Sequence, residues 1–149
     1  MTDSTKFLVA HATAPEWRDA AAKLALDLSP IEAAHRLGFL YVTDNYADAL
    51  GDIAVFLKQA TGVPHWVGTV GFGVCATRHE YFDEPAMAAL VAPIPEDAFR
   101  LFTGGEDGTA PSLGDLAEWS GDTPPLAVVH GDPRSGELPE LIEELAAAT

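Results

Sequence analysis

The chain has little cysteine, few basic residues and no long apolar run, and each shortage excludes a class of protein. Among its 149 residues there is one cysteine, Cys75, so an intrachain disulfide and a cysteine-based zinc site are both excluded. Sparing use of cysteine is typical of a reducing compartment. The N-terminal apolar run is too short for a signal peptide, and no run approaches the length of a membrane span. We therefore expect a cytoplasmic protein that does not enter a membrane.

The shortage of basic residues gives the chain a strong negative charge. Eight Lys and Arg stand against 23 Asp and Glu, for a net charge of −15. An electrostatic field of that sign repels nucleic-acid phosphates and anionic lipid headgroups, so the sequence predicts no nucleic-acid partner and no membrane-surface partner. The acidity itself indicates solubility rather than one particular function.

Sequence signatures of common enzymes and cofactor sites are also missing. There is no G-x-S-x-G elbow for a nucleophilic serine and no C-x-x-C-H for covalent haem. The glycines of Val67–Val74 (VGTVGFGV) follow the order G-x-x-G-x-G, and no helix is predicted after them, so they do not form a dinucleotide fingerprint. The sequence predicts no catalytic residues, and an enzyme using His11 or His130 as a base is kept only as an alternative.

Apolar runs alternate with helical stripes in the first half of the chain. Lys6–Thr13, Gly38–Thr43 and His65–Gly71 are runs typical of buried strands. Between them, apolar residues recur at spacings of three and four residues, which predicts two helices. The stripe positions are Trp17, Ala20, Ala21, Leu24 and Leu28 in the first helix and Leu50, Ile53, Ala54 and Leu57 in the second. This β-α-β-α-β order predicts parallel strands with right-handed crossovers.

Polar and glycine residues mark the ends of these elements. Asp44 or Asn45 is predicted to cap the second helix, and Gly62 is predicted to end it. Gly73–Thr77 is predicted to continue the third strand or to pair with it. At the N-terminus of the first helix, Trp17 is expected to anchor that helix to the sheet.

The second half predicts an antiparallel extension of the sheet and one more helix. Ala86–Ile94 and Ala98–Phe102 are predicted strands joined by a proline-containing turn. Leu126–His130 is predicted to be a last strand, and Glu137–Ala148 carries an apolar helical stripe. Leu113–Trp119 is predicted as a short helix within a glycine-rich surface loop. Together these elements predict one α/β domain over residues 1–149, with a mixed sheet flanked by helices.

The predicted order of elements ends on a helix, although a doubly wound pattern would supply another strand. We therefore expect either a natural protein that continues beyond Thr149 or a sheet edge that pairs with another copy or partner.

Polar and small residues follow each predicted parallel strand, and ligands of open α/β sheets bind at that edge. The residues expected along this rim are His11, Thr13, Thr43, Asp44, Asn45, Thr69 and Gly71. Glycine inside a strand permits close approach of a ligand or of another backbone. The predicted ligand-binding residues are therefore His11, Thr13, Asn45, Thr69, Gly71 and Gly73. The alternative is that strand ends carry polar residues simply because loops begin there.

Histidine and cysteine spacing predicts no metal site. Cys75 and His79 are four residues apart, which would bring them together only on a helix and would supply too few ligands for zinc. We expect Cys75 to fill the core, His35 to face solvent, and Asp132 to form an Asx turn.

Non-covalent haem is the one cofactor that the sequence leaves open, because a single imidazole can hold the iron. The candidate haem ligands are His11, His65, His79 and His130.

Several segments of the chain follow one another in a characteristic order. They are FLVAHAT followed by Trp17 and a helix, GFLYVT followed by an aromatic residue and a helix, VGTVGFGV, Tyr81, Glu84 and Pro85 before AMAALVAPI, Phe99–Phe102, and LAVVHGDP. In this order they resemble the N-terminal half of a FIST domain, an intracellular sensory module of signal transduction. The segment around Thr69 departs from the family pattern, since a second polar residue is common there.

The resemblance implies a sensory protein that binds a small molecule, with amino-acid-like compounds as the usual suggestion, and that signals through a partner protein. Some bacterial members resemble haem proteins that sense nitric oxide, so a haem-based gas sensor is an alternative. A second alternative is an interaction domain that self-associates and binds no ligand.

Overall fold

The computed structural model describes residues 5–102, 118–120, 123 and 125–148. Its contacts divide the chain into two compact units, Met1–Phe99 and Arg100–Thr149, which are treated separately below. Within the described residues, no helix has the length and apolarity needed to cross a bilayer.

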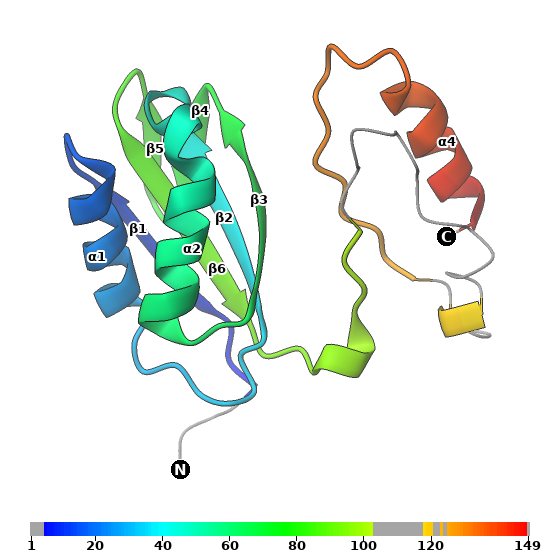
Figure 1. The fold of residues 1–149 in the computed structure, drawn as a ribbon, viewed down its shortest axis with the longest axis horizontal. Helices are drawn as coiled ribbons and strands as arrows, with labels where there is room; N and C mark the ends of the chain where they lie inside the picture. Colours follow the sequence, from blue (N-terminus) through cyan, green and yellow to red (C-terminus); the bar gives the residue numbers. More distant parts are fainter. Residues whose placement is uncertain (1–4, 103–117, 121–122, 124, 149) are drawn as a thin grey trace. The chain divides into compact units, whose positions relative to one another are not determined.

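The first unit contains a four-stranded mixed sheet, which confirms the predicted α/β class (Figure 1). Its strands are β1 (Leu8–Thr13), β2 (Leu37–Thr43), β3 (His65–Gly71) and β6 (Ala86–Ala92), in the order β1-β6-β2-β3. β2 and β3 are parallel neighbours, and β6 runs antiparallel to both β1 and β2. The antiparallel strand therefore lies inside the sheet rather than beyond its edge. β6 can occupy this central place because nearly all of its residues are apolar and buried.

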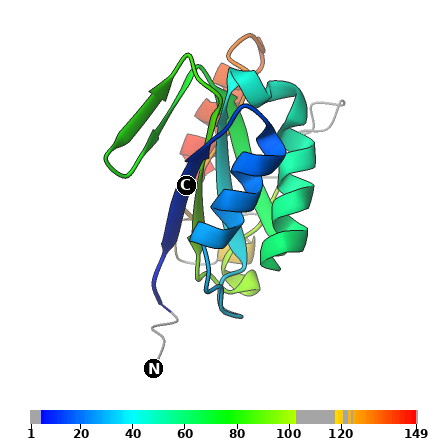
Figure 2. The ribbon, with the colours of Figure 1, turned by 90° about the vertical axis from the view of Figure 1, so that its left-hand side faces the viewer.

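Two helices, α1 (Trp17–Asp27) and α2 (Leu50–Thr61), cover the same face of this sheet (Figures 1 and 2). The predicted stripes are confirmed, since their inward residues form one core with alternate strand residues. Trp17 is half-buried against that core, with its ring edge toward Phe56. The fully buried large side chains are Leu24, Leu28, Leu40, Val42, Ile53, Leu57, Val63, Met87 and Val91.

β4 (Gly73–Ala76) and β5 (His79–Phe82) form a separate antiparallel hairpin. The sequence predicted that Gly73–Thr77 continues β3 or pairs with it. Instead β4 pairs with β5, from Gly73 opposite Phe82 to Ala76 opposite His79. Arg78 in the turn has a positive φ of 64°. Figure 2 shows the hairpin projecting from the side of the sheet opposite α1 and α2.

Two predictions about these elements are wrong. Neither Asp44 nor Asn45 caps α2, because both lie in a 3₁₀ helix, η1 (Asp44–Ala49), that leads directly into it; the predicted end at Gly62 is confirmed by its left-handed φ of 75°. Ala98–Phe102 is not a strand: a 3₁₀ turn, η2 (Glu96–Ala98), begins the segment. Pro93 and Pro95 precede that turn and have no amide hydrogen for a sheet ladder.

The second unit contains α4 (Leu138–Ala148), which confirms the predicted helix. Leu126–His130 is not a strand, since it pairs with no described segment and Leu126 is 93% exposed. Of the predicted helix Leu113–Trp119, residues 113–117 lie outside the described part, and residues 118–120 are helical. Asp132 forms the predicted Asx turn, because its Oδ1 accepts the Arg134 amide hydrogen at 2.9 Å.

Candidate functional site

The carboxyl ends of β1, β2 and β3 lie at one edge of the sheet, as the sequence predicted, but two of their hydroxyls hold the protein's own backbone. Thr13 Oγ1 donates to the Pro85 carbonyl at 2.6 Å. Thr43 Oγ1 donates to the Glu84 carbonyl at 2.9 Å and accepts the Ala86 amide hydrogen at 2.9 Å. Both threonines therefore fix the segment that enters β6, between the ends of β1 and β2.

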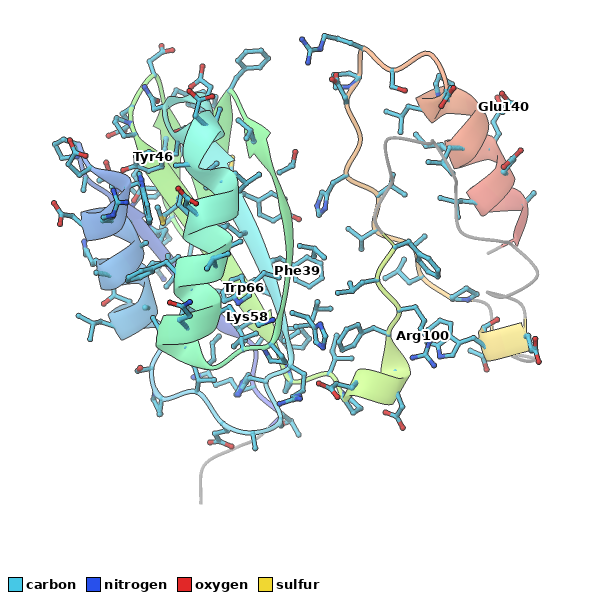
Figure 3. The ribbon with its side chains drawn as sticks, in the orientation of Figure 1. Phe39, Tyr46, Lys58, Trp66, Arg100 and Glu140 are labelled. Atoms are coloured by element: carbon cyan, nitrogen blue, oxygen red, sulfur yellow. The ribbon has the colours of Figure 1, made fainter. Side chains whose placement is uncertain are left out.

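Tyr46, labelled in Figure 3, strengthens this edge from the helical side. Its buried hydroxyl donates a hydrogen bond to the carbonyl of Ala14, just after β1. Burial raises the pKa of the Tyr46 phenol, so the phenol stays a hydrogen-bond donor at neutral pH.

The glycines near this edge make room for the chain itself. A Cβ on Gly71 would lie 2.8 Å from the Gly73 carbonyl oxygen, and a Cβ on Gly73 would lie 2.6 Å from the Phe82 ring. At Gly68 the added atom would lie 1.7 Å from the Leu40 carbonyl oxygen. The close approach that glycine permits is thus made by the protein's own atoms, and the glycines by themselves give no evidence of a ligand.

A cluster of three rings joins the hairpin to the sheet, and we call His11, His79 and Tyr81 the His–Tyr cluster. The ring centroids are 5.2 Å apart for His11 and His79, 5.4 Å for His79 and Tyr81, and 5.5 Å for His11 and Tyr81. The Tyr81 hydroxyl is hydrogen-bonded to Nδ1 of His11. The three rings thus form a nearly equilateral triangle built from β1 and β5.

The strand alternation explains why these rings meet. Ala10 and Ala12 of β1 are buried in the core under α1, so His11 between them faces the opposite side of the sheet. His79 and Tyr81 are two residues apart on β5 and share one of its faces. Tyr81 is 5% exposed whereas His79 is exposed, so a molecule from solvent can reach the cluster past His79.

The protonation of Tyr81 is set by its surroundings. Burial, and then the negative charge of Glu84, raise the pKa of its phenol. The hydroxyl therefore stays protonated at neutral pH and donates to Nδ1 of His11 when that imidazole carries its proton on Nε2.

The structure separates the remaining predicted site residues. Asn45 is exposed on η1, and Thr69 lies opposite Tyr41 in the β2–β3 register. His65 is at the start of β3, at the end of the sheet away from the cluster. Its ring centroid lies 5.4 Å from that of Phe99. His130 belongs to the second unit.

Two histidine and cysteine predictions are wrong. His35 is buried rather than exposed to solvent. Both of its ring nitrogens have backbone partners there, Nε2 the Lys6 carbonyl at 2.9 Å and Nδ1 the Glu32 amide at 3.1 Å. Cys75 is exposed on β4 rather than in the core. Because Cys75 and His79 lie on the two strands of a hairpin, helical spacing does not apply to them, and no three His, Cys, Asp or Glu side chains of the described residues form a metal-binding group.

Sequence reasoning missed the pairing of His11 with Tyr81. Tyr81 entered only as part of the family resemblance, and no local spacing relates residues 70 positions apart. The alternation of His79 and Tyr81 on a short strand was the one available signal that both rings face the same way.

Two hollows of the described residues have volumes of about 280 and 220 Å³, below the lower limit of about 300 Å³ for ordinary ligand pockets. Neither is lined by any of the four candidate haem ligands. We therefore assign no chemistry to haem, whose binding stays a prediction.

Comparison with known proteins identifies a family for most of the chain. The sequence matches the FIST N domain family over residues 36–149, a range that starts just before β2 and leaves β1 and α1 outside it. No curated protein matches the chain. Because the match covers most of the sequence, this chain belongs to the FIST N domain family of signal-transduction sensory domains.

Proposed function

We propose that the chain is a non-enzymatic sensory module that binds a small polar ligand at the carboxyl edge of its sheet, beside the His–Tyr cluster. Its membership of a sensory-domain family supports the general role. The position of the cluster supports the place, since ligands of open α/β sheets bind at this edge. The signal would pass to a partner protein or to a second copy of the chain.

The observation that carries the proposal is the contact between Tyr81 and His11. The β4–β5 hairpin forms its own sheet and shares no ladder with the main one. Its position therefore depends on the connecting segments and on side-chain contacts such as this hydrogen bond. A ligand that bonds to His11 or His79 would compete with that contact and move the hairpin, which is the differential interaction that a conformational response requires.

The cluster favours a ligand that hydrogen-bonds. Two imidazoles and a phenol can donate and accept hydrogen bonds, and they lie within reach of one small molecule. Amino-acid-like compounds, the class implied by the family, carry suitable donors and acceptors. They are the first compounds to test.

A melting-temperature screen against amino acids and related metabolites tests this proposal. A ligand that binds only the folded state stabilises it by about 2.7 kcal/mol at about 100 times its Kd. We expect a concentration-dependent increase in Tm for the natural protein that is lost in His11→Gln and in His79→Gln.

Glu80→Gln is the matched control, because Glu80 is exposed on β5 between His79 and Tyr81 and its side chain points to the other face of that strand. The increase in Tm should persist in this variant. An increase that persists in both cluster variants would contradict the proposed site. A Soret absorption band in the purified protein would instead favour the haem-sensor alternative, and a dimer without any ligand response would favour self-association.

A further inference from the structure

A second group of polar side chains lies at the opposite edge of the sheet. Arg36 comes just before β2 and His65 begins β3, and these two strands run parallel in neighbouring positions. Glu96, on η2 after β6, reaches the same edge. Its Oε1 accepts a hydrogen bond from Arg36 Nη2 and lies 3.4 Å from His65 Nε2. Two side-chain nitrogens, one just before β2 and one at the start of β3, thus lie close to one carboxylate oxygen.

Basic side chains are scarce in this chain, so two of them beside one carboxylate are notable. The sequence has eight Lys and Arg residues and 23 Asp and Glu residues, so few carboxylates can form an ion pair with a basic side chain. Arg36 is the first cause of the lowered pKa of Glu96, and His65 adds to it. The edge contact between His65 and Phe99 holds the imidazole in place.

The carboxylate that Arg36 holds lies beside an apolar hollow. The hollow has a volume of about 280 Å³ and is lined by Ala33, Ala34, Arg36, Pro93, Pro95 and Glu96. Its walls are methyl groups and proline rings around a single guanidinium and a single carboxylate. The volume suits a molecule smaller than the ligands that fill pockets of about 300 Å³ or more.

The bond between Arg36 and Glu96 is easy to replace. The two side chains are 36% and 51% exposed, and ion pairs exposed to this degree contribute little to stability because water screens them. Glu96 bonds through one oxygen to one guanidinium nitrogen, whereas guanidinium can bind a carboxylate through two parallel hydrogen bonds. A free carboxylate that approaches Arg36 from the hollow can make the two-bond arrangement.

We propose that Arg36, beside this hollow, is the receptor for a small monocarboxylate with a short apolar tail, and that Glu96 occupies this receptor as an internal competitor. The ligand carboxylate would bond to Arg36, and its tail would lie against Ala33, Ala34 and the two prolines. Binding would release Glu96, and with it η2, from the start of β2. This site is separate from the His–Tyr cluster and does not depend on it.

Titration with butyrate, followed by amide NMR shifts of the full chain, tests the proposal. We expect saturable shifts around Arg36 and η2 with butyrate and none with n-butanol, which has the same tail without the charge. Arg36→Gln should lose the butyrate response. Glu96→Ala should bind butyrate several-fold more tightly, because the variant removes the internal competitor.

Asp27→Asn is the control for net charge, since it removes one negative charge from the exposed end of α1. It should leave butyrate affinity within twofold of the natural protein. The proposal is overturned if butyrate and n-butanol give equal shifts, if Arg36→Gln keeps the natural affinity, or if Glu96→Ala binds no more tightly than Asp27→Asn. Melting curves of each variant show whether it is folded, and Arg36→Lys serves if Arg36→Gln is not.

Discussion

Tyr81 is hydrogen-bonded through its hydroxyl to Nδ1 of His11, so β5 is tied to β1 across 70 residues of sequence. The hairpin that carries Tyr81 has no backbone ladder with the main sheet. This side-chain contact therefore helps to hold the hairpin against the sheet, together with the packing of β4. It joins the edge strand β1 to the only element that lies on the face away from α1 and α2 within the first unit's described residues.

Removal of the Tyr81 hydroxyl should loosen the hairpin. Tyr81→Phe keeps the ring but deletes the donor to His11, at a cost of about 1 kcal/mol for one net hydrogen bond. We expect faster amide hydrogen exchange in β4 and β5 with little change in α2. Equal exchange in the variant and the natural protein would show that the hairpin is held in another way.

Thr43 should matter more for stability than Thr13, although both hydroxyls bind the segment before β6. Thr43 is fully buried and its hydroxyl both donates and accepts, whereas Thr13 is exposed and only donates. Thr43→Val leaves buried backbone groups without partners and should cost about 2 kcal/mol in the free energy of unfolding. Thr13→Val, the matched control, should cost about 0.5 kcal/mol, because water can replace the lost hydroxyl. Urea denaturation of the two variants measures the difference, and equal losses would contradict the assigned burial.

Two glycines should respond to alanine in opposite directions. An added Cβ at Gly68 would collide with the Leu40 carbonyl oxygen, while at Gly51, in α2, nothing lies within 4 Å. Gly68→Ala should therefore destabilise the protein by about 3 kcal/mol. Gly51→Ala should stabilise it by about 0.5 to 1 kcal/mol, since alanine is the better helix former. Thermal unfolding measures both changes, and a neutral Gly68→Ala would mean that β3 can move away from β2 without loss.

Asp132 should titrate at unusually low pH. Hydrogen bonds from Arg134 lower the pKa of its carboxyl from the ordinary 3.8 to about 2. A carboxyl whose pKa is lower in the folded state adds stability above its unfolded pKa, and that stability is lost as pH falls from about 3.8 toward 2. NMR titration of the Asp132 carboxyl carbon measures the midpoint.

Arg134→Gln tests the cause of that low value. The variant removes the charged partner and should return the midpoint most of the way to 3.8, because the backbone amide of residue 134 still donates. A midpoint that stays near 2 in the variant would assign the effect to the turn backbone instead.

The periodicity of the sequence predicted most helices and strands of the first unit. The stripes containing Leu24 and Leu57 are buried helix faces in the structure. An amphipathic helix is stabilised when its apolar face packs against a hydrophobic core. The two predicted strands that are wrong, Ala98–Phe102 and Leu126–His130, are apolar runs that join no ladder with another strand of the described residues. A strand is stable only when another strand bonds to it, and local composition does not supply that neighbour.

The sequence alone determined which residues repeat at helical or strand spacing, the turn at Asp132, the end of α2 at Gly62 and the family of the chain. These features depend on local conformation or on the order of segments. Only the tertiary structure decided that β6 lies between β1 and β2, that His11 meets Tyr81 and His79, and that Glu96 reaches Arg36. Such contacts join residues far apart in the chain, and they depend on how strands pair, which residue spacing does not specify.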